Sequence, residues 1–324
     1  MQIGRSMLII VMVVTGWKAV QGQKEDYNWI IGGDLAPSII DTLFERTGFD
    51  FNHKPVRIYH DTVREINMAG GNATISTSSG ELVACSNGQV LMDRWGGYIA
   101  DTINYSTDIP PQCNDWEEMN FGNSEMAVPG GLLGQQRIII LPVGNRYFTI
   151  YNTYNNCGTF VYKLSYTLFS VEGDEPIRVL KKDDVVLRDS LGGSGIYAVR
   201  HGNGRDWWLV TLSRGFEWLF VLEGDEKGLH YRHKLRTGYN KIATGTSGQI
   251  TFSPDGSLLA FYTGNRLQSA TGGGFCVASF DRCMGTLSGL QCKVLPQFGV
   301  ANGVEFSHDS RYLYAANGER LWQY

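Results

Sequence analysis

Short apolar stretches recur along the chain, and each follows a small polar turn built on Gly, Asn, Asp or Ser. Five such turn-and-strand units lie around Leu82, Tyr147, Trp207, Leu258 and Tyr312. Apolar residues within them alternate or run briefly without interruption, which is typical of β-strands rather than helices. Successive units are 51 to 65 residues apart. This spacing predicts a repeat of small antiparallel sheets, each of about four strands.

A small sheet with apolar residues on both faces must pack against neighbours of the same kind. We therefore predict an all-β fold, a β-propeller of about seven blades with six to eight left open, and less than about 10% helix. Weak helical periodicity occurs only at residues 38–48. The chain stops at GERLWQY, within a predicted strand, so we expect the C-terminal end of the propeller to be incomplete.

Three segments have more specific patterns. The polar stretch at 98–133, which contains Pro110 and Pro111, predicts a surface loop or lid. Residues 176–191 alternate like strands around a solvated turn at 181–184. Residues 194–235 predict three strands, with hairpin turns at 201–205 and 223–228.

Residues 1–22 have the pattern of an export signal. Arg5 supplies the positive start, an apolar stretch follows, and small residues precede Gln23. The apolar stretch is shorter than the roughly 20 residues that cross a bilayer, although an N-terminal membrane anchor is the alternative. We expect the propeller to occupy residues 23–324 and to be secreted or on the cell surface, with the periplasm as the alternative location.

Charge restricts the class of partner. The chain has a net charge of -4 and no cluster of Lys and Arg, which excludes a dedicated nucleic-acid surface. Its many aromatic residues instead suit a protein or glycan ligand. No later stretch is apolar for long enough to predict a transmembrane helix.

Six cysteines in an exported chain favour disulfides over zinc ligation, and no C-x-x-C pair is present. Cys276, Cys283 and Cys292 share one predicted hairpin, where any two could approach across the turn. We expect at least one disulfide to involve Cys283. The partners of Cys85, Cys113 and Cys157 stay open.

The segments FSPDGSLLAFY and FSHDSRYLYAA resemble the turn-and-strand unit of tryptophan-aspartate-like propeller repeats. With ISTSSGELVACSNG, QRIIILPVGN, AVRHGNGRDWWLV and FDRCMGTLS, they make the chain similar to exported propellers of Bacteroidetes. Many of those proteins carry a C-terminal sorting module for type IX secretion, which this sequence lacks. The resemblance covers about residues 27–324 and implies a propeller without implying an activity.

His201 is the most attractive candidate for catalysis, with Arg205 and Asp206 beside it in one turn. A general base or an anion site could be built there. The structural alternative is a turn in which Asp206 caps backbone amides and Trp207 and Trp208 point to opposite faces of a strand.

Metal sites have weaker support. His230 and His233 lie three apart, which on a regular strand places them on opposite faces. The acidic turn EGDEKG could hold calcium weakly, but it lacks the alternating carboxylates of a calcium loop. We therefore assign no metal and no cofactor.

No Walker loop, nucleophile elbow or H-E-x-x-H motif occurs. The function that this sequence predicts is an exported, non-enzymatic propeller that binds a protein or a glycan. The alternative is a lactonase-type hydrolase or lyase, which would require carboxylates and histidines from different blades to converge on the central channel. A structural module of a larger adhesin is the third possibility.

Overall fold

The structure is a computed structural model of the chain. It describes residues 24–32, 46–64, 66, 68, 73–87, 90–99, 138–154, 161–173, 175–192, 195–237, 249–263, 274–295, 302–317 and 320–324. The predicted signal at 1–22 lies outside these residues, as does the insertion at 98–133 except for its first two positions.

The strands of the described residues form six sheets. The first sheet contains β1 (Asn28–Ile31), β2 (Thr47–Asp50) and β3 (Arg57–His60). The second sheet contains β4 (Ala73–Ser76), β5 (Leu82–Ser86) and β6 (Leu91–Asp93). The third sheet contains β7 (Ile138–Val143), β8 (Arg146–Tyr154), β9 (Val161–Ser170) and β10 (Arg178–Leu191).

The remaining three sheets follow in the same manner. The fourth contains β11 (Tyr197–Arg200), β12 (Trp207–Leu212), β13 (Trp218–Asp225) and β14 (Gly228–Arg236). The fifth contains β15 (Ile250–Phe252), β16 (Leu258–Thr263), β17 (Gly274–Asp281) and β18 (Thr286–Val294). The sixth contains β19 (Asn302–Phe306), β20 (Leu313–Asn317) and β21 (Leu321–Gln323).

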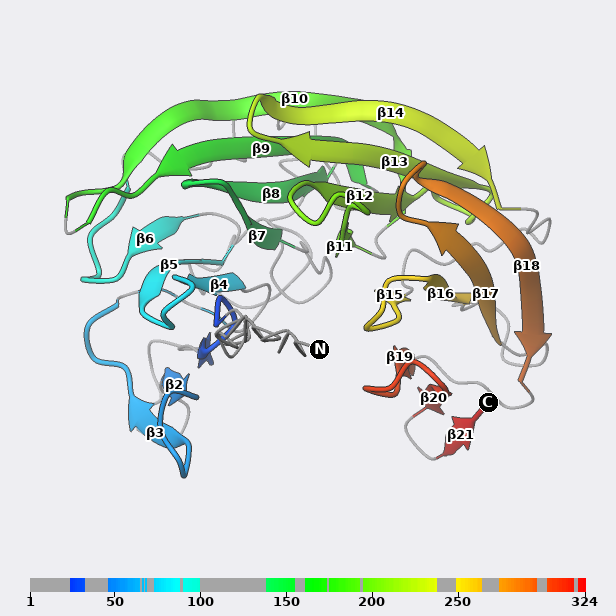
Figure 1. Ribbon diagram of the computed structural model, residues 1–324, viewed down its shortest axis with the longest axis horizontal. Coiled ribbons are helices and arrows are strands. Elements are labelled where there is room, and N and C mark those ends of the chain that lie inside the picture. The colour runs from blue at the N-terminus through cyan, green and yellow to red at the C-terminus, as the bar shows by residue number, and fades with distance from the viewer. Residues whose placement is uncertain are drawn as a thin grey trace, which may run out of the picture.

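Within each sheet the strands pair in chain order and antiparallel, so every sheet is a simple meander. The six sheets follow one another along an arc, with β1–β3 and β19–β21 at its two ends (Figure 1). This arrangement is that of a β-propeller, and the all-β prediction is confirmed: the described residues contain no helix. Consequently none of them forms a helix able to cross a membrane. A seventh blade stays a prediction.

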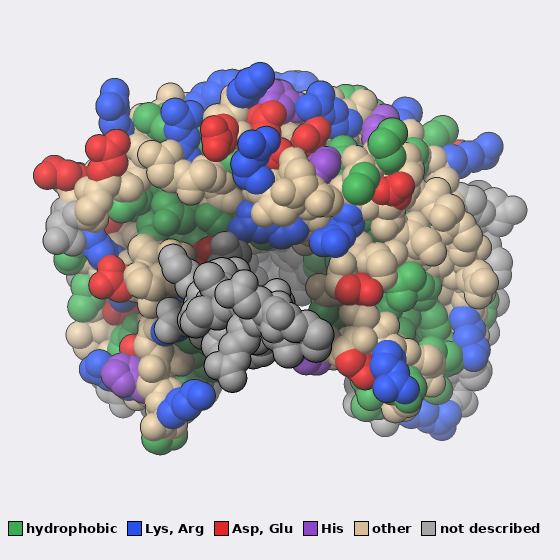
Figure 2. All heavy atoms as spheres, in the orientation of Figure 1, with side chains coloured by type: hydrophobic (Ala, Val, Ile, Leu, Met, Phe, Trp, Pro, Cys, Tyr) green, Lys and Arg blue, Asp and Glu red, His purple; other side chains and the backbone are tan. Residues whose placement is uncertain are grey.

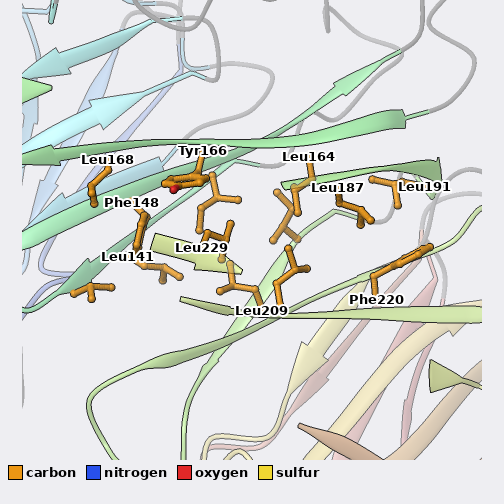
Figure 3. Close-up of a cluster of buried hydrophobic side chains, with 14 of the residues drawn as sticks. Leu141, Phe148, Leu164, Tyr166, Leu168, Leu187, Leu191, Leu209, Phe220 and Leu229 are labelled. Carbon is orange, nitrogen blue, oxygen red and sulfur yellow. The ribbon is translucent and has the colours of Figure 1, made fainter. Parts of the chain in front are cut away.

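The hydrophobic core is divided among the spaces between neighbouring sheets. Five clusters of buried side chains each combine residues from two consecutive sheets. Strand β13 shows how one strand serves two clusters, because Phe220 and Leu222 pack toward the third sheet while Leu219 and Val221 pack toward the fifth. Figure 3 shows the cluster between the third and fourth sheets, where Phe148 and Phe220 are both fully buried. A sheet that lies between two others packs one of its faces against each of them, as the sequence predicted.

Two boundaries differ from the sequence prediction. Residues 181–184 are not a turn but part of the continuous strand β10, whose register against β9 shifts around them. Asp183 has a φ of 50°, so a bulge accommodates the polar residues without ending the strand. The three strands predicted over 194–235 are four, because a turn at 213–217 separates β12 from β13. The end of the weakly helical stretch, at Thr47 and Gly48, belongs to strand β2.

The outermost strands carry many charged side chains. Exposed Lys and Arg residues lie on β10 and β14, which form the outer edge of the third and fourth sheets (Figure 2). They are Arg178, Lys181, Lys182, Arg188, Arg232, Lys234 and Arg236. Charges on an unpaired edge oppose pairing with strands of other molecules, so these edges are protected against aggregation.

Candidate functional site

The three catalytic candidates lie together in the turn at 201–206, between β11 and β12. Asp206 is buried, and its carboxylate accepts hydrogen bonds from the side chain of Asn203 (2.6 Å) and from Arg205 Nε (3.2 Å). His201 stacks on Trp208, with the ring centroids 5.0 Å apart. Its Nδ1 accepts the backbone N–H of Asn203 at 3.0 Å. The sequence therefore located a real cluster of these side chains.

These contacts occupy the groups that catalysis would need. Burial opposes the charge on Asp206, but the hydrogen bonds from Arg205 and Asn203 outweigh it and lower the pKa of this carboxyl group. The ionised carboxylate is thus already engaged within the turn. Nδ1 of His201 accepts the backbone N–H of Asn203, so the lone pair of this nitrogen is engaged within the turn. The geometry favours the structural interpretation of the turn.

The same turn recurs in the next two sheets, which explains its residues. In each copy the first residue donates its N–H to the carbonyl of the sixth, as in His201 to Asp206 and Ser253 to Leu258. The fourth residue donates back to the first and has a positive φ, which is 73° at Gly204, 71° at Gly256 and 60° at Ser310. His201 therefore occupies the position of Ser253 in a turn that belongs to the repeat.

The capping side chain is the third residue of the turn rather than the sixth. Asn203 Oδ1 accepts the N–H groups of Arg205 (2.9 Å) and Asp206 (3.0 Å), and Asp255 accepts that of Ser257 (3.0 Å). The prediction that Asp206 caps backbone amides is thus wrong, because its carboxylate binds side chains. Aligning HGNGRD with SPDGSL would have identified Asn203 as the cap from sequence.

Trp207 and Trp208 point to opposite faces of β12, as alternation predicted. Trp207 Nε1 donates to the carbonyl of Pro142 in the third sheet at 2.7 Å, and the guanidinium of Arg200 lies 3.9 Å from its ring centroid. Trp208 Nε1 donates to the carbonyl of Arg282 in the fifth sheet at 2.6 Å. The two indoles therefore connect one blade to both of its neighbours.

The disulfide joins Cys276 and Cys292, which lie opposite each other on β17 and β18. Cys283 is an exposed free thiol in the turn between these strands. The expectation that a disulfide involves Cys283 is wrong, because the register of the hairpin sets the other two cysteines side by side and leaves Cys283 at its tip. Cys85 is buried and free, and Cys113 and Cys157 lie outside the described residues.

His230 and His233 bind different partners. A register shift in the β13–β14 pair places His230 opposite Glu223 and His233 opposite Val221, so both histidines share one face, contrary to the regular alternation assumed from sequence. His230 contacts Asp225, and His233 contacts the carbonyl of Gly285. Across the described part of the chain, no three or more His, Cys, Asp or Glu side chains form a group that could hold a metal ion.

The acidic turn after β13 is held by its own carboxylate. Asp225 Oδ1 accepts the backbone N–H groups of Lys227 (2.8 Å) and Gly228 (3.1 Å). The carbonyl of Glu226 accepts a hydrogen bond from Arg146 in the third sheet (3.2 Å). The turn thus caps itself and contacts the neighbouring blade.

A second turn, at 93–97, presents aromatic residues to solvent. Trp95 is 51% exposed, and Tyr98, which follows the turn directly, is 62% exposed. The carboxylate of Asp93 fixes the backbone by accepting the N–H groups of Trp95 (2.9 Å) and Gly97 (2.7 Å). We call Arg94, Trp95 and Tyr98 the aromatic surface.

Arg94 connects Trp95 to neighbouring parts of the fold. Its guanidinium lies 4.4 Å from the ring centroid of Trp95, donates to the carbonyl of Gly173 in the third sheet at 2.8 Å, and lies 3.7 Å from Glu81. Sequence reasoning missed this surface. The available signal was the segment DRWGGY, in which large aromatic residues flank a glycine turn where no strand can bury them.

No protein-family model matches the chain, and no curated protein matches it. Solved structures share its fold only distantly. A putative 6-phosphogluconolactonase from Bacteroides fragilis is 13% identical over 90% of this chain and 88% of its own, with a TM-score of 0.37. The NanB sialidase from Streptococcus pneumoniae is 13% identical over 84% and 38%, with a TM-score of 0.36.

The fucose-specific lectin from Aleuria aurantia is 11% identical over 57% of this chain and 61% of its own, with a TM-score of 0.33. The three proteins include both binding and hydrolytic activities. Similarity at this level carries no argument about what this chain binds.

Proposed function

We propose that this protein is an exported binding propeller without enzymatic activity and that its aromatic surface recognises a glycan. The observation that carries the proposal is the pair of exposed rings, Trp95 in the 93–97 turn and Tyr98 directly after it. The backbone of this turn and the guanidinium of Arg94 are held by hydrogen bonds. By contrast, the candidate catalytic turn at 201–206 has its polar groups engaged internally.

The chemistry of the surface suits a sugar. The C–H face of a pyranose ring stacks on an aromatic face, and hydroxyl groups beside that contact need charged or polar partners. Glu81, whose side chain is 71% exposed and lies 3.7 Å from Arg94, supplies an acceptor beside the guanidinium that contacts Trp95. Because the turn is already ordered, a ligand would not have to immobilise it, and little conformational entropy is lost on binding.

Export rests on two observations. Residues 1–22 have the pattern of a signal, and the Cys276–Cys292 disulfide is typical of proteins that leave the reducing cytosol. We expect the mature protein to begin at Gln23. Mass spectrometry of the secreted protein would test this, and a chain retaining Arg5 inside the cell would contradict it.

Glycan binding is tested with an array of immobilised oligosaccharides, followed by calorimetry on the strongest binder. Trp95→Ala should weaken binding at least about tenfold, which corresponds to about 1.4 kcal/mol. Met284→Ala is the control, because Met284 is also an exposed apolar side chain (64%) and lies in a turn of the fifth sheet. Binding that is equal in both variants, or absent from the array, would reject the proposal.

The hydrolase alternative has its own readout. Turnover of simple lactones by the wild-type protein, abolished in His201→Ala but retained in Trp95→Ala, would replace the binding function with a lactonase-type activity. We expect no turnover in any of the three proteins.

A further inference from the structure

The third sheet has a group of buried hydroxyl groups on the face that points toward the second sheet. Along β8, Ile150 packs toward the fourth sheet, so its neighbours Thr149 and Tyr151 point the other way. The register sets Thr149 opposite Thr167 and Tyr151 opposite Ser165 on β9, so all four side chains share this face. None of the four is more than 4% exposed. We call Thr149, Tyr151, Ser165 and Thr167 the hydroxyl cluster.

Asp183 adds a carboxylate to the hydroxyl cluster from the outer strand β10. Strands β8, β9 and β10 lie side by side in the third sheet (Figure 1), and the Tyr151 hydroxyl donates a hydrogen bond across β9 to Asp183 Oδ1. The Asp183 N–H donates to Thr167 Oγ1 at 3.3 Å. Burial, together with the Asp183 carboxylate, raises the pKa of Tyr151, so the phenol keeps its proton and remains the donor.

The backbone at Asp183 directs this carboxylate toward the cluster. Asp183 lies in the bulge of β10 and has a φ of 50°, a conformation that costs free energy for a residue other than glycine. Bulges occur where a side chain is re-aimed, and strained residues are concentrated at ligand sites. The strain is thus accompanied by a contact between the Asp183 side chain and buried hydroxyl groups.

Two members of the hydroxyl cluster lack a hydrogen-bond partner. Thr149 Oγ1 and Ser165 Oγ are both inaccessible to solvent, and neither bonds to any of the described residues. A buried polar group without a partner lowers stability and is uncommon in native proteins. The four residues of the cluster form a two-by-two block on adjacent strands, so these two oxygen atoms lie beside the groups that contact Asp183.

Oxygen atoms of a carboxylate and of several hydroxyl groups are suitable ligands for a hard cation. Calcium sites use several carboxylates, whereas one carboxylate among neutral hydroxyl groups balances a single positive charge. We propose that Asp183 and the hydroxyl cluster bind a monovalent cation, sodium or potassium, between the second and third sheets. Most of its ligands are hydroxyl oxygens, so the site differs from the groups of three His, Cys, Asp or Glu that the described residues do not form.

Thermal melts of the dialysed protein test the proposal. At equal ionic strength, sodium or potassium chloride should raise the melting temperature by at least about 2 °C relative to N-methylglucamine chloride, because a ligand of the folded state stabilises it. Asp183→Asn should abolish this rise. Asp184→Asn is the matched control and should retain it, because the adjacent carboxylate pairs with Lys181 (2.6 Å) and is partly exposed. Circular dichroism confirms that each variant is folded.

Three results of these melts would overturn the proposal. They are a wild-type protein that melts at one temperature in all the salts, a rise that only calcium chloride produces, and a rise of equal size in Asp183→Asn.

The role of the hydroxyl groups is tested by substitutions that keep the shape of the side chain. In N-methylglucamine chloride, Ser165→Ala and Thr149→Val should melt at or above the wild-type temperature, because each removes a buried group without a partner. In sodium or potassium chloride, both variants should lose most of the cation-dependent rise. If each variant instead differs from the wild type by the same amount in every salt, the hydroxyl groups hold no cation and the proposal is wrong.

The inference goes beyond the glycan function and is independent of it. Trp95→Ala should retain the cation-dependent rise in melting temperature, and Asp183→Asn should bind the glycan as the wild type does. Loss of the cation effect and loss of glycan binding are therefore separate outcomes.

Discussion

The turns at 201–206 and 93–97 are built in similar ways but have opposite relations to their surroundings. In each, a polar side chain caps the backbone and a glycine has positive φ, 73° at Gly204 and 86° at Gly96. The first turn contains His, Arg and Asp and packs on the fifth sheet, where Gly202 N–H and Trp208 Nε1 both donate to the carbonyl of Arg282. The second turn leaves Trp95 in solvent.

The difference shows that residue type alone does not identify a site. In the 201–206 turn, His201 and Asp206 are engaged in hydrogen bonds within the turn, and His201 also stacks on Trp208. The tryptophan of the 93–97 turn follows β6, the last strand of its sheet, and is half exposed. Four experiments would break or sharpen this comparison.

The largest effect is expected at the two tryptophans. Trp208 is 4% exposed, so Trp208→Ala should lower the free energy of unfolding by about 3–5 kcal/mol through the cavity it leaves. Trp95→Ala should change it by no more than about 0.5 kcal/mol, because its ring is half exposed. Denaturant unfolding of both variants measures the difference. Equal destabilisation by the two substitutions would contradict the distinction between a buried Trp208 and a solvent-facing Trp95.

The disulfide stabilises the sheet on which the 201–206 turn docks. Cys292→Ala removes the Cys276–Cys292 link, whose partners are 16 residues apart, and alters only an exposed side chain. Loss of the link should cost about 3 kcal/mol, chiefly because the unfolded chain gains entropy. Thermal melts measure the loss, and Cys283→Ala serves as the control. A Cys283→Ala protein that melts as low as Cys292→Ala would mean that the pairing is different.

His201→Ala should have a moderate effect. The substitution removes the hydrogen bond from Asn203 N–H and the stacking on Trp208, for an expected loss of about 0.5–1.5 kcal/mol in unfolding free energy. Glycan affinity should stay at the wild-type value, because the residue lies in another sheet. Calorimetry beside a thermal melt checks both quantities. Normal stability with lost activity or binding would restore a functional role for His201.

The smallest expected effect is on the decrease of folding stability at acid pH. Hydrogen bonds from the hydroxyl group of Ser253 and the backbone of Ser257 lower the pKa of Asp255 from 3.8 to about 2. Since the folded pKa is depressed, this carboxylate stabilises the fold above pH 3.8, and the contribution is lost as the pH falls toward 2. In Asp255→Asn protein, the free energy of unfolding should therefore decrease less than in the wild type as the pH falls from 3.8 to about 2. An Asp255→Asn protein whose stability falls as steeply as that of the wild type over this range would contradict the prediction.

Strand identity and the repeat could be read from the sequence because they depend on neighbours along the chain. Alternation and short apolar runs identified β7, β8 and β16, and the polar turns marked most hairpins. The turn at 213–217 was missed, because the apolar segments around it, Trp207–Leu212 and Trp218–Asp225, read as one continuous strand region. The β10 bulge was taken for a turn because four polar residues interrupt its pattern.

Pairing and availability were decided only by the tertiary structure. The register of β17 and β18 selected Cys276 and Cys292 from three candidate cysteines, and a bulge brought His230 and His233 to one face. Docking of one blade on the next buried Trp208, while Trp95 and Trp29 stayed exposed. Hydrogen bonding within turns and side-chain alternation along strands involve only a few neighbouring residues, so they can be predicted from the sequence. The partner of each sheet face comes from a segment some 50 residues away, so its identity appears only when the sheets are assembled.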